Sequence, residues 1–178
     1  MNEGIADALM FEAMKFEGLY FQDMTLEEYP QILEVLDEWG VRMNPTIEHA
    51  HFYALEQDSD GTTGVYDKRD KSIGFVLDGL TANTICHEMI HHYEYELDEL
   101  DESLRQYLTI KLWQKLSPKI PNLESRVLKH IEATEHRKLE NEGGQHDVLF
   151  LLKSYDIDMR TNVPLGTTFG YGYGPQEG

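Results

Sequence analysis

The chain contains little cysteine and no long apolar run, and each absence argues against a class of protein. Cys86 is the single cysteine among 178 residues, so neither an intrachain disulfide framework nor a zinc site built from cysteines is possible. No stretch of about 18 apolar residues occurs, which argues against a transmembrane helix, and residues 1–7 lack the features of a secretory signal. We therefore expect a cytoplasmic protein that does not associate with membranes.

Basic residues are also scarce. The 15 lysines and arginines stand against 33 acidic residues, which gives a formal net charge of −18 at pH 7. A field of this sign repels phosphate backbones, so it disfavours direct binding to DNA or RNA. Solubility is the plain explanation of such a charge, and a basic partner or mimicry of nucleic acid is the sharper one. The acidic residues are spread along the sequence, which gives mimicry little support.

The apolar residues follow the periods of helices and short strands. They make up 40% of the chain, which is enough for the core of one domain. Their spacing predicts strands over residues 47–56, 64–66 and 72–77. It predicts helices over residues 4–20, 29–39, 81–97, 104–116, 122–141 and 148–155. We predict one α+β domain over residues 1–165 and a flexible tail, rich in glycine and tyrosine, over residues 166–178.

Two histidines four residues apart carry the strongest chemical signal. His87 and His91 lie in the helix predicted over residues 81–97, where this spacing places both imidazoles on one face. Two imidazoles in this arrangement can share one zinc ion. Zinc lowers the pKa of a bound water to about 7, and Glu88 can reach that water and take its proton. The pattern therefore predicts zinc-dependent hydrolysis of a peptide bond.

The residues around this motif resemble a known family. The stretch from Gly61 to His92 contains a glycine-bearing hairpin, a strand with Ile73, and then the His-Glu-Met-Ile-His motif on a helix. It is similar to the SprT-like zinc metallopeptidases, which are zincins with an HExxH motif. The resemblance implies a small sheet packed on the active-site helix. It also implies a third zinc ligand after glycines and before a phenylalanine-containing helix, and His146 matches that position.

The chain departs from the family in two respects. Residues 93–141 are longer than the usual connection between the second and third ligands, and they predict a helical insertion before the third ligand. The cysteine-rich zinc ribbon and the basic surface of DNA-associated members are absent, so a role on DNA-bound proteins does not carry over. A second source of the third ligand stays open, because another class of zincins takes a glutamate from a second helix. The candidates on the helix over residues 122–141 are Glu132, Glu135 and His136.

Other residues near the motif have several possible roles. His49 and His51 would share one face of the strand over residues 47–56. The strand over residues 72–77 would be the sheet edge beside the active-site helix, where zincins bind an extended substrate by β-augmentation. Three tyrosines are equal candidates for stabilising the oxyanion: Tyr93, Tyr95 and Tyr155.

These patterns lead to a main hypothesis and an alternative. The main hypothesis is a zinc metalloendopeptidase that acts on a protein or peptide, with His87, His91 and His146 as zinc ligands and Glu88 as the base. The alternative is a catalytically silent, zinc-stabilised protein that contacts partners through its acidic surface, its N-terminal helix or its C-terminal tail. Glu88 separates the two, because a structural zinc site does not need it and normally has a fourth protein ligand.

Overall fold

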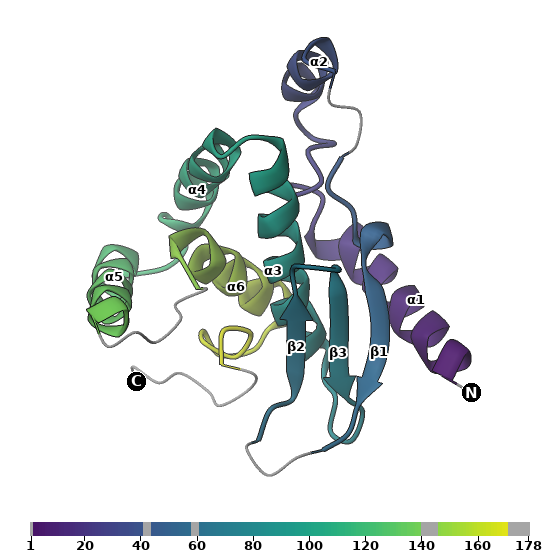
Figure 1. Cartoon of the computed structure of the whole chain (residues 1–178). Helices are drawn as coiled ribbons and strands as arrows, with labels where there is room; N and C mark the ends of the chain where they lie inside the picture. Colours follow the sequence, from purple (N-terminus) through teal and green to yellow (C-terminus); the bar gives the residue numbers. More distant parts are fainter. Residues whose placement is uncertain (1, 41–43, 58–60, 140–145, 171–178) are drawn as a thin grey trace.

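The computed structural model describes residues 2–40, 44–57, 61–139 and 146–170. Within these residues the protein has an α+β architecture of six α-helices, one short 3-10 helix and three strands (Figure 1). Helix α1 lies on the β1 side of the sheet, whereas α4, α5 and α6 lie on the β2 side (Figure 1). The fold class predicted from the sequence is therefore confirmed at the level of α+β.

The sheet consists of β1 (His51–Leu55), β2 (Gly64–Asp67) and β3 (Ser72–Val76), in the spatial order β1-β3-β2. β3 pairs in parallel with β1 and antiparallel with β2. The prediction that residues 72–77 form the sheet edge is wrong, since β3 is the central strand. The four residues from Ile73 to Val76 are all buried, as expected for a strand covered on both faces. The edge strand beside the histidine-bearing helix is β2.

The strand predicted over residues 47–56 is wrong in its first part. The 3-10 helix η1 (Ile47–His49) begins there instead, because the Thr46 hydroxyl caps it by accepting the Glu48 N–H at 3.2 Å. His49 and His51 therefore do not share a strand face. The imidazole of His49 lies 2.8 Å from a carboxylate oxygen of Glu96, while His51 is exposed.

Helix α1 (Asn2–Tyr20) is part of the core and still exposes apolar side chains. It packs against β1 and η1, and it buries Leu9, Ala13 and Phe16. Its outer side exposes Phe11, Met14 and Leu19. Helix α2 (Pro30–Glu38) stands apart from the sheet and the central helices in Figure 1. Binding of a partner at the N-terminal helix stays a prediction.

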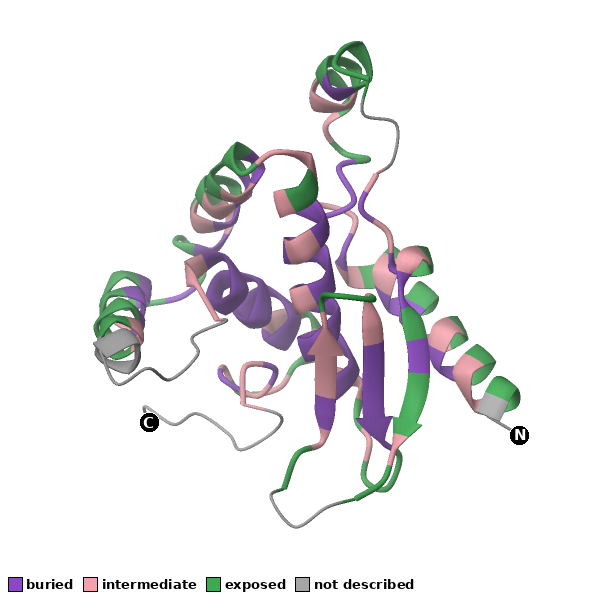
Figure 2. Cartoon of the chain, viewed as in Figure 1, coloured by how far each residue is buried: buried purple, intermediate pink, exposed green. Residues whose placement is uncertain are grey.

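Two buried helices lie next to each other at the centre of the molecule. Helix α3 (Ala82–Leu100) packs against β2, and helix α6 (Val148–Thr161) packs against α3. Thr81 and Asp147 cap their first turns by accepting backbone N–H groups of Thr84 and Phe150. Figure 2 shows α6 and much of α3 as buried, whereas α4 and α5 show exposed outer faces.

Of the stretch predicted as a helical insertion, residues 93–100 belong to α3, and that the remainder is an insertion stays a prediction. The rest of the connection between the second and third histidines is helical over most of its described length. It contains α4 (Ser103–Leu116), which contacts α3 and α6, and α5 (Leu123–Leu139), which contacts α6. Both helices thus pack against the α3–α6 pair. None of the helices in the described parts of the chain combines the length and apolar character needed to cross a membrane.

Candidate metal centre

Three histidines from two parts of the chain meet at one point. Helix α3 presents His87 and His91, and His146 lies just before α6. One ring nitrogen from each histidine lies within 4.8 Å of the others. The ring centroids are separated by 4.9 to 5.2 Å. The structure thus places His146, which was predicted from the resemblance, beside His87 and His91, which were predicted from the motif. All three are positioned to hold a metal ion.

The two competing glutamates on α5 are not part of the cluster that the described residues form. Glu132 and Glu135 are exposed to solvent, and the side chain of His136 lies outside the described residues. Instead, the buried His130 of the same helix donates its Nε2 hydrogen to the backbone carbonyl of His146 at 2.6 Å. Helix α5 therefore supports the third histidine by a hydrogen bond to the backbone of His146. The sequence could have indicated this role, because Leu123, Val127 and His130 recur at helical spacing and form the buried face of this polar helix.

Hydrogen bonding and burial hold the imidazoles in the form that binds metals. The Nδ1 hydrogen of His87 is donated to the carbonyl oxygen of Thr168 at 2.8 Å, which leaves Nε2 as a ligand atom. Burial lowers the pKa of His87 to about 4. Burial, together with the two neighbouring imidazoles, lowers the pKa of His91 to about 2. Both side chains are therefore neutral at pH 7 in the metal-free protein.

An aromatic wall restricts the three rings. The Phe150 ring centroid lies 4.8 Å from that of His87, 4.6 Å from that of His91 and 4.5 Å from that of His146. Phe169 adds a second contact, with its ring centroid 5.1 Å from that of His146. These contacts give the cluster an apolar backing, which limits rotation of the imidazoles and excludes water from one side.

Glu88 lies between the cluster and the edge strand. It is only 2% exposed, and its Oε2 atom is 3.9 Å from Nε2 of His87. Gly64 of β2 lies directly against it, since a Cβ atom at this glycine would be 3.1 Å from both Cγ and Oε2 of Glu88. A glycine at this position lets the strand approach the carboxylate closely, so β2 helps to set the orientation of Glu88.

The cluster opens into a cleft of about 830 Å³ between β2, α3 and α4. His87, Glu88, His91 and His146 all line it. Of the three tyrosines considered for the oxyanion, Tyr95 alone lines the cleft. Tyr93 and Tyr155 are instead buried in the core.

The cleft wall contains a buried carboxyl group that the sequence reasoning missed. Glu94 follows His87 and His91 at helical spacing on the same face of α3, and this i, i+4, i+7 pattern was the available signal. Burial raises the pKa of Glu94 to about 8, although the Arg105 guanidinium lies 4.0 Å away and opposes that rise. Arg105 is held away from Glu94 by ion pairs with Asp98 at 3.2 Å and with Asp147. Arg105 thereby links α4 to the residue that follows His146.

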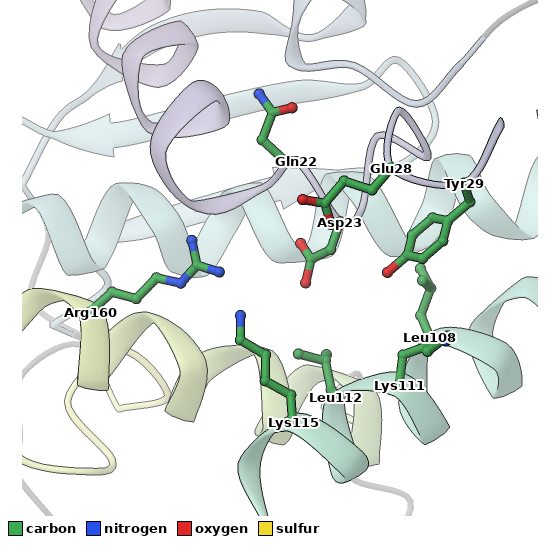
Figure 3. A pocket seen from close by; sticks show the side chains of 9 residues that line it. All are labelled: Gln22, Asp23, Glu28, Tyr29, Leu108, Lys111, Leu112, Lys115 and Arg160. Carbon is green, nitrogen blue, oxygen red and sulfur yellow. The ribbon is translucent and has the colours of Figure 1, made fainter. Parts of the chain in front are cut away.

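A second hollow, of about 300 Å³, shares no lining residue with this cleft. It lies between α4, α6 and the segment after α1, and Figure 3 shows Lys115 and Asp23 facing each other across it. Lys115 is paired with the buried Asp156 at 3.0 Å. Because the histidines that could hold a metal line the first cleft, we place the candidate site there and not in this second hollow.

The segment after α6 contributes to this cluster. Residues 166–170, which we expected to belong to a flexible tail, instead lie against α3 and α6, and Thr168 is fully buried. Residues 171–178, the rest of the predicted tail, lie outside the described residues.

Comparisons with family models, curated proteins and solved structures found no match for this chain.

Proposed function

We propose that this protein is a zinc-dependent metalloendopeptidase. The observation that carries the proposal is the position of Glu88, whose buried carboxylate lies beside three histidines and lines the same cleft. Three imidazoles are a donor set that suits zinc. A structural zinc site would need no carboxylate base and normally has a fourth protein ligand. Among the described residues the group that could hold a metal consists of the three histidines, and this supports an open, catalytic position.

Each group has a defined task in this proposal. His87, His91 and His146 would hold the ion, with His87 oriented by its bond to Thr168. Bound zinc would polarise the substrate carbonyl and lower the pKa of the attacking water. Glu88 would accept the proton of that water and return it to the nitrogen of the leaving amine. Its orientation against Gly64 keeps the carboxylate close to the cluster.

The edge strand offers a binding mode for an extended substrate. β2 pairs with β3 on one side only among the described strands, and its four residues line the cleft beside Glu88. A peptide bound in extended form along this edge strand would carry its scissile bond past the histidines. Membership of the SprT-like family is part of the same proposal. It is supported by the order of the elements: a hairpin, the HExxH helix, and a third histidine before the helix that contains Phe150.

The proposal is tested by measuring zinc content and cleavage of an unfolded protein substrate, in the wild type and in Glu88→Gln. We expect one zinc per chain in both proteins and cleavage by the wild type alone, with a loss of at least about 100-fold in the variant. Zinc in both proteins with equal cleavage would show that Glu88 is not the base. Zinc in both without cleavage by the wild type would favour the alternative, a zinc-stabilised binding protein. A folded wild type that binds no zinc would refute both.

A further inference from the structure

A buried carboxylate on α6 holds the loop that contacts the first histidine. Asp158 has no exposed surface, and it accepts three hydrogen bonds from the loop that follows the helix. The donors are the backbone N–H of Gly166 at 2.9 Å, the N–H of Thr168 at 2.9 Å and the hydroxyl of Thr168 at 2.6 Å. Hydrogen bonds to a buried carboxylate are strong, so the loop is anchored to a rigid element.

Thr168 connects this anchor to the metal centre. Its N–H and hydroxyl bind Asp158, while its carbonyl oxygen accepts the Nδ1 hydrogen of His87 at 2.8 Å. The hydroxyl also accepts a hydrogen bond from the side-chain amide of Asn83, in the first turn of α3, at 2.8 Å. Because Thr168 is bound on both sides, the direction of its carbonyl is set by α6 and by the start of α3.

We propose that Asp158 is a positioning residue of the metal centre, which acts through Thr168 to keep His87 in the Nδ1–H tautomer with Nε2 directed at the metal. The inference rests on metal binding by the three histidines and does not depend on peptide hydrolysis. Groups that orient a ligating histidine in this indirect way typically change metal affinity by about 10- to 100-fold when they are removed.

A simpler explanation is that Asp158 only stabilises the fold. Phe169 also contacts His146, and this packing could hold the loop without the carboxylate. The two explanations predict different results for the His87 tautomer in a folded variant. A purely structural Asp158 would change the unfolding temperature and leave the tautomer as it is. A positioning Asp158 would change the tautomer and the metal affinity together.

The decisive variant is Asp158→Asn in the full chain, because asparagine keeps the shape but offers one acceptor oxygen instead of two. Two quantities are measured at pH 7: the Kd for zinc by competition with a chromophoric chelator, and the His87 tautomer in metal-free protein by long-range ¹H–¹⁵N NMR. We expect a Kd raised about 10- to 100-fold and a mixture of tautomers in place of Nδ1–H alone. Asp101→Asn is the matched control: it removes the same charge from the turn before α4, where Asp101 accepts the Ser103 N–H, and should change the Kd less than about twofold.

An Asp158→Asn protein that is folded and keeps both the wild-type Kd and the wild-type tautomer would overturn the proposal. If this variant does not fold, Thr168→Val decides, since it removes only the hydroxyl and keeps the carbonyl that binds His87. We then expect a Kd raised at least about threefold, and an unchanged Kd with an unchanged tautomer would overturn the proposal equally. If the wild type binds zinc but cleaves nothing, the proposed function fails while the role of Asp158 is still decided. If the wild type binds no zinc, there is no metal centre for Asp158 to position, and the proposal is overturned together with the proposed function.

Discussion

Replacing Glu94 with glutamine should stabilise the metal-free protein by an amount that depends on pH. Burial raises the pKa of this carboxyl from 4.5 to about 8 in the folded protein. Between these two values the unfolded chain releases the proton while the folded protein retains it, so the stability of the wild type falls as the pH rises. Below pH 4.5 both states are protonated and the difference vanishes. Glutamine carries no proton to lose, so the variant escapes this dependence.

The size of the effect follows from the same two values. Each pH unit in the window is worth about 1.4 kcal/mol, so the wild type loses about 2 kcal/mol by pH 6 relative to the variant. Above pH 8 the gap reaches about 5 kcal/mol, which is an upper bound because a buried carboxylate gains water or moves toward Arg105 as it ionises. A domain of this size is typically stable by about 5–15 kcal/mol, so the effect is readily measured.

The assay is urea unfolding in the presence of a chelator, at pH 4.5, 6, 7 and 8.5, for the wild type and Glu94→Gln. The chelator matters because a bound cation near Glu94 would favour its ionised form. The stability difference should grow steadily with pH and level off near pH 8. Glu102→Gln, at the exposed residue directly before α4, is the control and should show a nearly constant difference. If the Glu94→Gln difference is also constant across this range, the reasoning from burial is wrong.

Two further predictions concern the metal centre itself. Gly64→Ala would place a methyl group 3.1 Å from Cγ and Oε2 of Glu88, so hydrolysis should fall about 10- to 100-fold while zinc content is unchanged. Gly18→Ala is the control: its new methyl group would meet no atom within 4 Å, so the hydrolysis rate and the zinc content should both stay as they are. Because the pKa values of His87 and His91 are about 4 and about 2, protons compete weakly with a metal, and zinc affinity measured by chelator competition should fall less than about fivefold from pH 8 to pH 6. Three ordinary histidines would lose tens of fold over this interval, and such a loss would contradict the inferred burial.

The sequence predicted the parts of the site that depend on local spacing. A separation of four residues on a helix is enough to place His87 and His91 together, and α3 begins at Ala82, one residue from the predicted start at residue 81. The third histidine could not be derived from spacing, because 54 intervening residues can return to the site by many routes. It was predicted from the resemblance alone, and the structure places it beside the other two.

Strand order and loop anchoring depend on contacts between distant segments, so local patterns were poor guides to them. The consecutive apolar run from Ile73 to Val76 is typical of a central strand, but the position next to the active-site helix suggested an edge. The glycines and tyrosines after residue 165 indicated a flexible tail, whereas Thr168 is held by Asp158, a residue ten positions earlier. Asp158 itself was a usable signal, since a carboxylate inside a helix of buried residues needs a partner.

Helix α6 holds the three histidines in place from both of its ends. Its first turn follows His146 and carries Phe150, which contacts all three imidazoles, and its last turns carry Asp158, which anchors the loop that binds His87. Between them Lys153, fully buried, pairs with Asp23 and Asp156 at 2.9 Å and fastens the helix to the segment after α1. These contacts fix both ends of α6 relative to α3 without using the outer faces of α4 and α5. The connection before His146 adds to this hold, through the bond from His130 of α5 to the carbonyl of His146 and the ion pair of Arg105 of α4 with Asp147.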